Sequence, residues 1–75
     1  MADRENFSAR LRRMRKRRGL TRQALSQLCG LSGNMVGCYE NGANRPGADA
    51  LESMAEFFGV SVDYLLCRTD DPRTL

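Results

Sequence analysis

The sequence predicts a single all-α domain of five short helices. In several separate stretches, apolar residues recur at the three- and four-residue spacing that lines one face of a helix. Glycines stand just after these stretches, where they commonly end helices. The 75 residues suit one domain with one modest core. We expect a frayed N-terminus over residues 1–6, the folded domain over 7–67 and a flexible polar tail over 68–75.

The first predicted helix begins at Phe7 and runs to about Arg18, with Gly19 as its stop. Phe7, Leu11 and Met14 form its apolar stripe. The other faces are crowded with seven cations in nine residues. Because such a density of like charge repels itself, we expect anions to lie nearby.

Two short helices joined by a tight turn are predicted over residues 21–42. Thr21 can cap the first of them with its hydroxyl, and Gly30 ends it. Its apolar residues are expected on one buried face, which holds Leu25, Leu28 and Cys29. Ser32 is the expected N-cap of the second helix, which ends at the Asn41–Gly42 pair.

The second of these helices has two different faces. Its spacing predicts that Val36 and Tyr39 point into the core. The outer face is the candidate binding surface, and it holds Gly33, Asn34, Gly37 and Cys38. It is therefore poor in side chains.

The last two helices close the core. A loop over residues 43–47 leads into the stretch from Ala48 to Phe58, which has apolar residues at helical spacing and is ended by Gly59. Ser61 is expected to cap a short final helix. The apolar residues of the two helices are Leu51, Met54, Ala55, Phe58, Val62, Leu65 and Leu66.

Charge is divided unevenly along the chain. Residues 1–46 carry ten Lys or Arg against three acidic residues, whereas residues 47–75 carry two against six. The net charges of the two parts are therefore +7 and −4, within a total of +3. A basic cluster of this kind raises affinity for phosphates and speeds encounter with nucleic acid. A solvated helix face is the alternative interpretation.

The stretch TRQALSQLCGLSGNMVGCYENG resembles the helix-turn-helix of the phage repressor, Cro and Xre family of DNA-binding proteins. The flanks FSARLRRMRKRRGLT and NRPGADALESMAEFFGVSVDYLL extend the likeness, which covers residues 7–66. The resemblance implies a compact, five-helix, lambda-repressor-like DNA-binding domain in which helices 2 and 3 form the motif. Matching positions include Arg15, Gly30, Glu40, Pro46 and Asp63.

The resemblance also implies which residues hold the motif and which touch DNA. Arg15 is expected to pair with Glu40, because the matching residues pair in that family. Arg22 matches a family position that touches the DNA backbone, and Arg45 lies on the loop after the reading helix. The full set of expected phosphate contacts is Arg22, Asn41, Arg45, Arg17, Arg18 and Arg10.

Base reading is expected at the outer face of the second motif helix: Gly33, Asn34, Gly37 and Cys38. Relatives usually place glutamine, arginine, serine or threonine there, so this chain departs from the family pattern. Asn34 alone can form the bidentate pair with adenine, worth about 1–3 kcal/mol of discrimination. Gly37 should cost the helix about 1 kcal/mol relative to alanine. Either the bare backbone reads groove shape, or the domain discriminates poorly between bases.

The predicted function is sequence-preferring binding of double-stranded DNA by a small transcriptional regulator, with repression expected. A homodimer would place two reading helices in major grooves about 34 Å apart. Its expected contacts are Tyr64, Leu65 and Leu66, which could equally pack within one chain. The alternative is a protein-binding module on the same fold, such as an antitoxin or a regulator's partner. An enzyme is not expected, because the sequence has no histidine and no nucleophile paired to a base.

The three cysteines do not predict a metal site. Cys29, Cys38 and Cys67 are an odd number without Cys-x-x-Cys spacing, so we expect free thiols. No cofactor and no small-molecule ligand is expected. The sequence has no signal-peptide pattern and no long apolar run, which predicts a cytoplasmic protein without a membrane partner.

Overall fold

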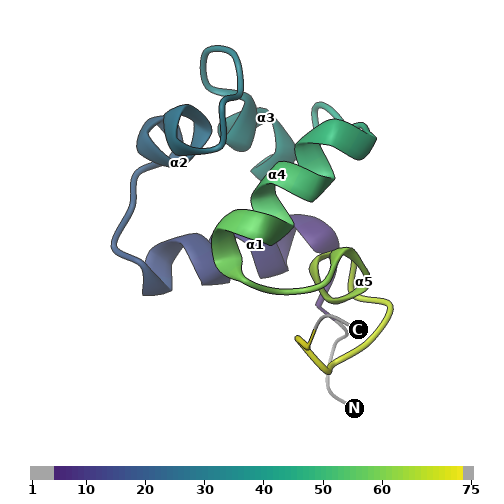
Figure 1. Ribbon diagram of the computed structural model, residues 1–75. Coiled ribbons are helices and arrows are strands. Elements are labelled where there is room, and N and C mark those ends of the chain that lie inside the picture. Colours follow the sequence, from purple (N-terminus) through teal and green to yellow (C-terminus); the bar gives the residue numbers. More distant parts are fainter. Residues whose placement is uncertain (1–4, 74–75) are drawn as a thin grey trace.

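The computed structural model describes residues 5–73, and all regular structure within them is helical. The helices are α1 Phe7–Arg17, α2 Arg22–Leu28, α3 Met35–Glu40, α4 Ala48–Phe58 and α5 Val62–Leu65. Figure 1 shows α2 and α3 side by side, with their connecting loop projecting from the body of the domain. The prediction of an all-α fold with five helices is confirmed. The fraying expected at residues 1–4 and 74–75 concerns positions outside the described residues.

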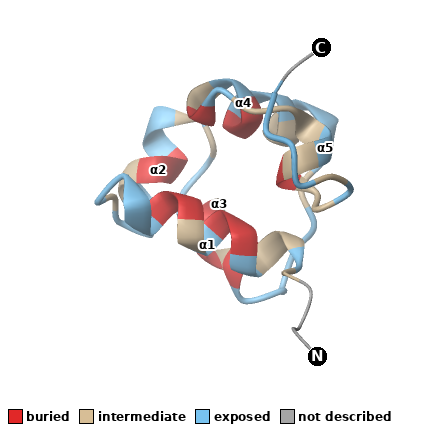
Figure 2. Cartoon of the chain, turned by 90° about the horizontal axis from the view of Figure 1, so that it is seen from below, coloured by how far each residue is buried: buried red, intermediate tan, exposed pale blue. Residues whose placement is uncertain are grey.

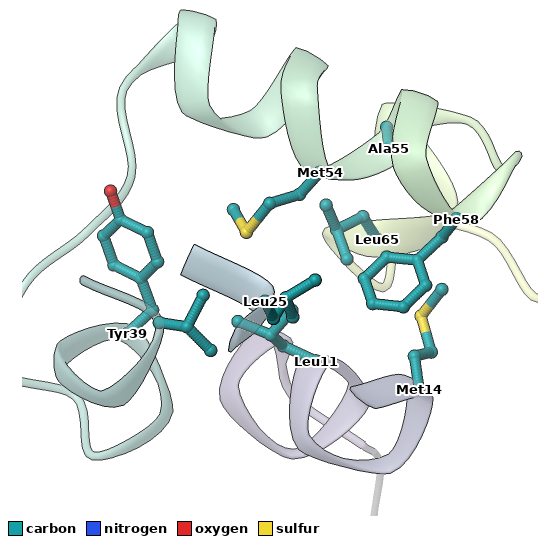
Figure 3. Close-up of a cluster of buried hydrophobic side chains, with 9 residues drawn as sticks. Leu11, Met14, Leu25, Tyr39, Met54, Ala55, Phe58 and Leu65 are labelled. Carbon is teal, nitrogen blue, oxygen red and sulfur yellow. The ribbon is translucent and has the colours of Figure 1, made fainter. Parts of the chain in front are cut away.

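One core joins all five helices. Figure 2 shows the buried positions of the helices facing the middle of the molecule, and Figure 3 shows the side chains that meet there. The buried apolar residues are Leu11, Met14, Leu25, Val36, Tyr39, Met54, Ala55, Phe58 and Leu65. Within the motif, α2 buries Leu25 and Ser26, and α3 buries four of its six residues. The buried residues of α1, α4 and α5 complete the core around them.

Side-chain caps fix where several helices begin. The hydroxyl of Thr21 accepts from the amide of Ala24 at 3.0 Å, and that of Ser61 accepts from the amide of Tyr64 at 3.0 Å. Both caps were predicted and are confirmed. Such caps satisfy backbone donors that have no partner within the helix, and each contributes about 1 kcal/mol.

The buried face of α2 differs from the prediction at Leu28. This side chain is 58% exposed, whereas Ser26 is fully buried. The Ser26 hydroxyl donates to the carbonyl of Arg22 at 2.9 Å and accepts from the amide of Val36 at 3.0 Å. The inward face is centred between Leu25 and Ser26, which leaves Leu28 on the outer side. A polar residue that serves as a hydrogen-bond bridge between α2 and α3 is not visible to an apolar periodicity.

The folded unit includes residues on both sides of the predicted boundaries. The side-chain oxygen of Asn6 caps α1 by accepting from the amide of Ala9 at 2.8 Å. In the C-terminal segment, the carbonyl of Pro72 accepts from the amide of Ser61 at 3.0 Å. Residues 5–6 and 69–72 thus contact the helices.

Candidate nucleic-acid interface

The predicted ion pair between α1 and α3 is present. Arg15 donates from Nε to Oε2 of Glu40 at 2.6 Å and from Nη2 to Oε1 at 3.0 Å. Its Nη1 donates to the carbonyl of Leu20 at 2.6 Å. Both side chains are buried, with exposures of 8% and 1%. This bidentate pair fixes the end of α3 against α1.

Two further arginines lie near the carboxylate of Glu40. Arg22 donates from Nε to Oε1 of Glu40 at 3.2 Å, and the Nε of Arg12 lies 3.6 Å from the same oxygen. Burial by itself would raise the pKa of Glu40, but the hydrogen bonds and charge of Arg15, followed by those of Arg22, outweigh it and lower the pKa. Three arginines around one carboxylate leave a local excess of positive charge. Arg12 was not among the predicted site residues, although its position three residues before Arg15 places it near the same side of α1.

The reading helix begins two residues later than predicted. Asn34, not Ser32, is the N-cap of α3, and its Oδ1 accepts from the amide of Gly37 at 3.3 Å. The physical reason is Gly33, whose φ of 52° is left-handed and keeps the preceding turn off the helical path. The turn is therefore longer than the sequence suggested, and the helix is only six residues long.

Gly37 does not belong to the outer face of α3. It is buried, and a Cβ at this position would lie 2.6 Å from Nδ2 of Asn34. The capping side chain of Asn34 therefore occupies the space that a side chain at position 37 would need. Among the four predicted base-reading residues, Gly33 and Asn34 are exposed and Cys38 is half-buried. These three remain candidates.

Most of the predicted phosphate contacts lie at the surface. Arg17, Arg18, Arg22, Asn41 and Arg45 are all exposed. Arg18 is partly engaged, because its guanidinium lies 5.3 Å from the centre of the Phe57 ring and 5.4 Å from that of Phe58. Arg22 is also engaged, because its Nε donates to Oε1 of Glu40. Arg17 and Arg45 present charge, and Asn41 presents an amide group, at the surface.

Arg10 is the exception, and its predicted phosphate contact is wrong. It is 6% exposed, and its guanidinium donates to Oε1 of Glu5 at 2.8 Å and to the carbonyls of Tyr64 and Thr69 at 2.7 and 3.0 Å. Nη2 also reaches Oδ1 of Asp70 at 3.3 Å. Burial works to lower the pKa of Arg10, yet the hydrogen bonds to Glu5 and Asp70 raise it above its usual value. With its donors committed inside the domain, Arg10 is a structural residue.

The three predicted dimer contacts differ in their burial. Leu65 is fully buried in the core, so it cannot meet a second copy. The ring of Tyr64 is half-buried, and the guanidinium of Arg10 lies 4.2 Å from its centre. Leu66 is also half-buried. Only Tyr64 and Leu66 therefore remain as candidate contacts.

The described residues also show the state of the cysteines, the arrangement of metal-binding side chains and the character of the helices. The three cysteines are free thiols. Within residues 5–73, no group of His, Cys, Asp or Glu is arranged to hold a metal ion. None of the helices described by the structure has the length and apolar character needed to cross a bilayer.

Sequence comparison identifies the family. The family described as "Helix-turn-helix domain" matches residues 6–65. The uncharacterized HTH-type transcriptional regulator YobD of Bacillus subtilis (strain 168) is 39% identical over 66 residues, covering 88% of this chain and 59% of that protein. The HTH-type transcriptional regulator AnsR of the same organism is 32% identical over 65 residues, covering 87% and 56%. The chain thus spans less than two thirds of the length of these two relatives.

Solved structures lead to the same family. The P22 c2 repressor in complex with synthetic operator 9T is similar with a TM-score of 0.76 and 26% identity, over 83% of this chain and 94% of that one. The solution structure of the DNA-binding domain of the P22 c2 repressor gives a TM-score of 0.75 and 25% identity, over 87% and 86%. With the family match over 6–65, the chain belongs to the helix-turn-helix domain family, in its phage repressor type.

Proposed function

We propose that the chain binds double-stranded DNA with sequence preference and acts as a transcriptional repressor. The observation that carries the proposal is the exposed start of α3, at Gly33 and Asn34, with the exposed Arg22 and Arg45 on neighbouring segments. Support comes from the relatives named as transcriptional regulators and from the P22 c2 repressor, whose structure contains an operator. The chain performs no catalytic step and needs no cofactor in this proposal.

Phosphate contacts set the register of the domain on the duplex. Arg22 at the start of α2, Asn41 at the end of α3 and Arg45 on the loop before α4 would grip the backbone on the two sides of the groove. Arg17 and Arg18 at the end of α1 extend this basic surface. Each contact releases counterions, so affinity depends steeply on salt.

Asn34 is the proposed base-reading side chain. Its Oδ1 accepts one hydrogen bond from the amide of Gly37, which leaves a second lone pair, and its amide nitrogen has two donors. These groups match N6 and N7 of adenine in the major groove. Cys38, one turn along α3, would touch a thymine methyl, and Gly33 would let the backbone come close to the groove.

A homodimer completes the proposed arrangement. Two copies related by a two-fold axis would present their α3 helices to successive major grooves about 34 Å apart. Tyr64 and Leu66, half-buried in one copy, are the proposed contacts. The operator would then be palindromic, and the dimer would act in the cytoplasm.

A selection of bound sequences from a random duplex pool tests the function. We expect enrichment of a palindromic site, and mobility shifts of that site that weaken as salt rises. Because the exposed cations bind any duplex weakly, some shift of random DNA is expected at low salt. If neither DNA shifts at low salt, the proposal is wrong, and the alternative of a protein-binding module is favoured.

A further inference from the structure

A groove with a volume of about 670 Å³ runs along the outer side of α1 and ends at Glu40 of α3. Its charged residues are Arg12, Arg13, Lys16, Arg17 and Glu40. Four cations against one carboxylate make this a strongly positive surface. Apart from Glu40, its lining residues lie outside the motif helices, and the expected contacts of the helix-turn-helix include one of these cations, Arg17.

The charges in the groove are matched to different degrees. Arg13 is paired, because it donates to both oxygens of Glu5 at 2.6 and 2.9 Å, a carboxylate that it shares with Arg10. Glu40 is already held through both oxygens by Arg15. Within residues 5–73, Lys16 and Arg17 have no carboxylate at ion-pair distance. The groove therefore keeps an unbalanced positive charge.

Arg12 is the cation best placed to change partners. Its Nε lies 3.6 Å from Oε1 of Glu40, too far for a good hydrogen bond, and its side chain is 51% exposed. If Arg12 left, Glu40 would still be neutralised by its bidentate bonds to Arg15. Arg15 has no such freedom, because it is buried and its departure would leave a buried carboxylate without its main partner.

We propose that this groove binds the sugar–phosphate backbone of duplex DNA beside the segment read by α3, and that Arg12 moves from Glu40 to a phosphate when DNA binds. The inference rests on the proposed function. Glu40 joins the groove to Arg22, so one positive surface continues from α1 to the start of α2. From Ser8 to Arg17 the helix rises about 14 Å. One DNA strand carries a phosphate about every 3.4 Å of its axis, so the groove is long enough for more than one.

The chemistry of the groove favours a polyanion over a small polar ligand. The hydroxyl of Ser8, which lines it, is committed to the carbonyl of Tyr39 at 2.6 Å. The open lining therefore offers mainly long, flexible cationic side chains. These suit repeated phosphates, which need charge more than a fixed pattern of donors and acceptors.

The test compares single-charge variants on the duplex selected for the wild-type protein. Arg12→Gln and Lys16→Gln should each lower the slope of log K against log salt by about 0.9, without changing which duplex is preferred. Arg73→Gln is the matched control, because it also removes one charge but lies on the C-terminal segment, paired with Asp71. Its slope should equal that of the wild type. Melting temperatures should match the wild type, since half-exposed ion pairs contribute little to stability.

The outcomes separate the two proposals. If the wild-type protein binds with sequence preference but both variants keep its slope, the groove proposal alone is overturned. If the wild-type protein binds no duplex, both proposals fail. The partner exchange has its own readout: on addition of duplex, the Nε–Hε NMR resonance of Arg12 should shift while that of Arg15 stays in place. An unshifted Arg12 resonance in the bound state would overturn the exchange.

Discussion

The first helix carries two buried arginines that hold different parts of the domain together. Arg15 binds Glu40 and the carbonyl of Leu20, so it fastens α1 to the helix-turn-helix. Arg10 binds Glu5 and the carbonyls of Tyr64 and Thr69, so it joins the residue before α1 to α5 and the segment that follows it. Each residue is 6% exposed.

Arg10 and Arg15 show that residue type alone does not reveal the role of an arginine in this chain. Ten arginines and lysines before residue 47 suggest one phosphate-binding surface. In the structure, two of the arginines instead neutralise carboxylates and satisfy carbonyls in the interior. Arg12 and Arg22 lie near the carboxylate of Glu40, at the place where Arg15 fixes α3. A buried arginine therefore positions α3, and in the proposed function exposed cations supply the affinity for DNA.

The largest effect is expected for Arg15→Ala. Removing this side chain leaves Glu40 buried without its bidentate partner, which should lower the free energy of unfolding by about 3–5 kcal/mol. Urea unfolding followed by circular dichroism measures the change, with Arg12→Gln as the control for loss of charge near Glu40. A midpoint equal to that of the wild type would contradict the structural role of the pair.

Arg10→Met should have a smaller effect on stability and none on the electrostatics of binding. Methionine keeps the apolar stem but leaves the carbonyls of Tyr64 and Thr69 without their donor, at a cost of about 2–3 kcal/mol. The salt dependence of DNA binding should stay at the wild-type slope. A slope lowered by about 0.9 would mean that Arg10 does contact a phosphate.

Acid should weaken the contacts of the N-terminal segment. The hydrogen bond from Arg13, helped by that from Arg10, lowers the pKa of Glu5 from 4.5 to about 2. Because the unfolded chain then binds more protons, the stabilisation by Glu5 is complete above about pH 4.5 and is lost as pH falls towards 2. The full change in pKa corresponds to about 3 kcal/mol, which solvent screening of the partly exposed Glu5 reduces to about 2 kcal/mol. Unfolding midpoints measured across this range should fall less steeply for Glu5→Gln, and equal slopes for both proteins would contradict the assignment.

Gly37→Ala should change stability least. The new methyl group improves helix propensity by about 1 kcal/mol, but it displaces the Asn34 side chain and so removes a cap of about the same worth. The two effects should nearly cancel. In a double-mutant cycle, Asn34→Ala should cost about 1 kcal/mol in the wild type and almost nothing beside Gly37→Ala. Equal costs in both backgrounds would show that the two sites are independent.

The features that could be predicted from the sequence depend on local chemistry or on the family resemblance. Helical spacing placed the five helices, hydroxyls at Thr21 and Ser61 marked two of their starts, and the family pattern supplied the pair of Arg15 with Glu40. Spacing and caps involve only residues that are close in sequence, and the ion pair follows from the family resemblance.

The features that could not be predicted depend on partners distant in sequence or on a backbone angle. Three of the four groups that accept hydrogen bonds from Arg10 lie more than fifty positions away. Two of them are backbone carbonyls, which every residue has and which no residue type can reveal. The late start of α3 follows from the left-handed Gly33, and the burial of Gly37 follows from the side chain of Asn34. Ser26 faces the core through a hydrogen bond to α3 that apolar spacing does not reveal.

The ratio of two dissociation constants shows whether α3 reads DNA sequence. The wild-type protein is titrated with the duplex selected from a random pool and with a scrambled duplex of equal length and composition, at the same salt. We expect a lower Kd for the selected duplex, and Asn34→Ala should reduce the preference by about 5- to 150-fold, as expected for one bidentate contact. Equal Kd values of the wild-type protein for both duplexes would contradict the claim that α3 is presented to DNA as a reading element.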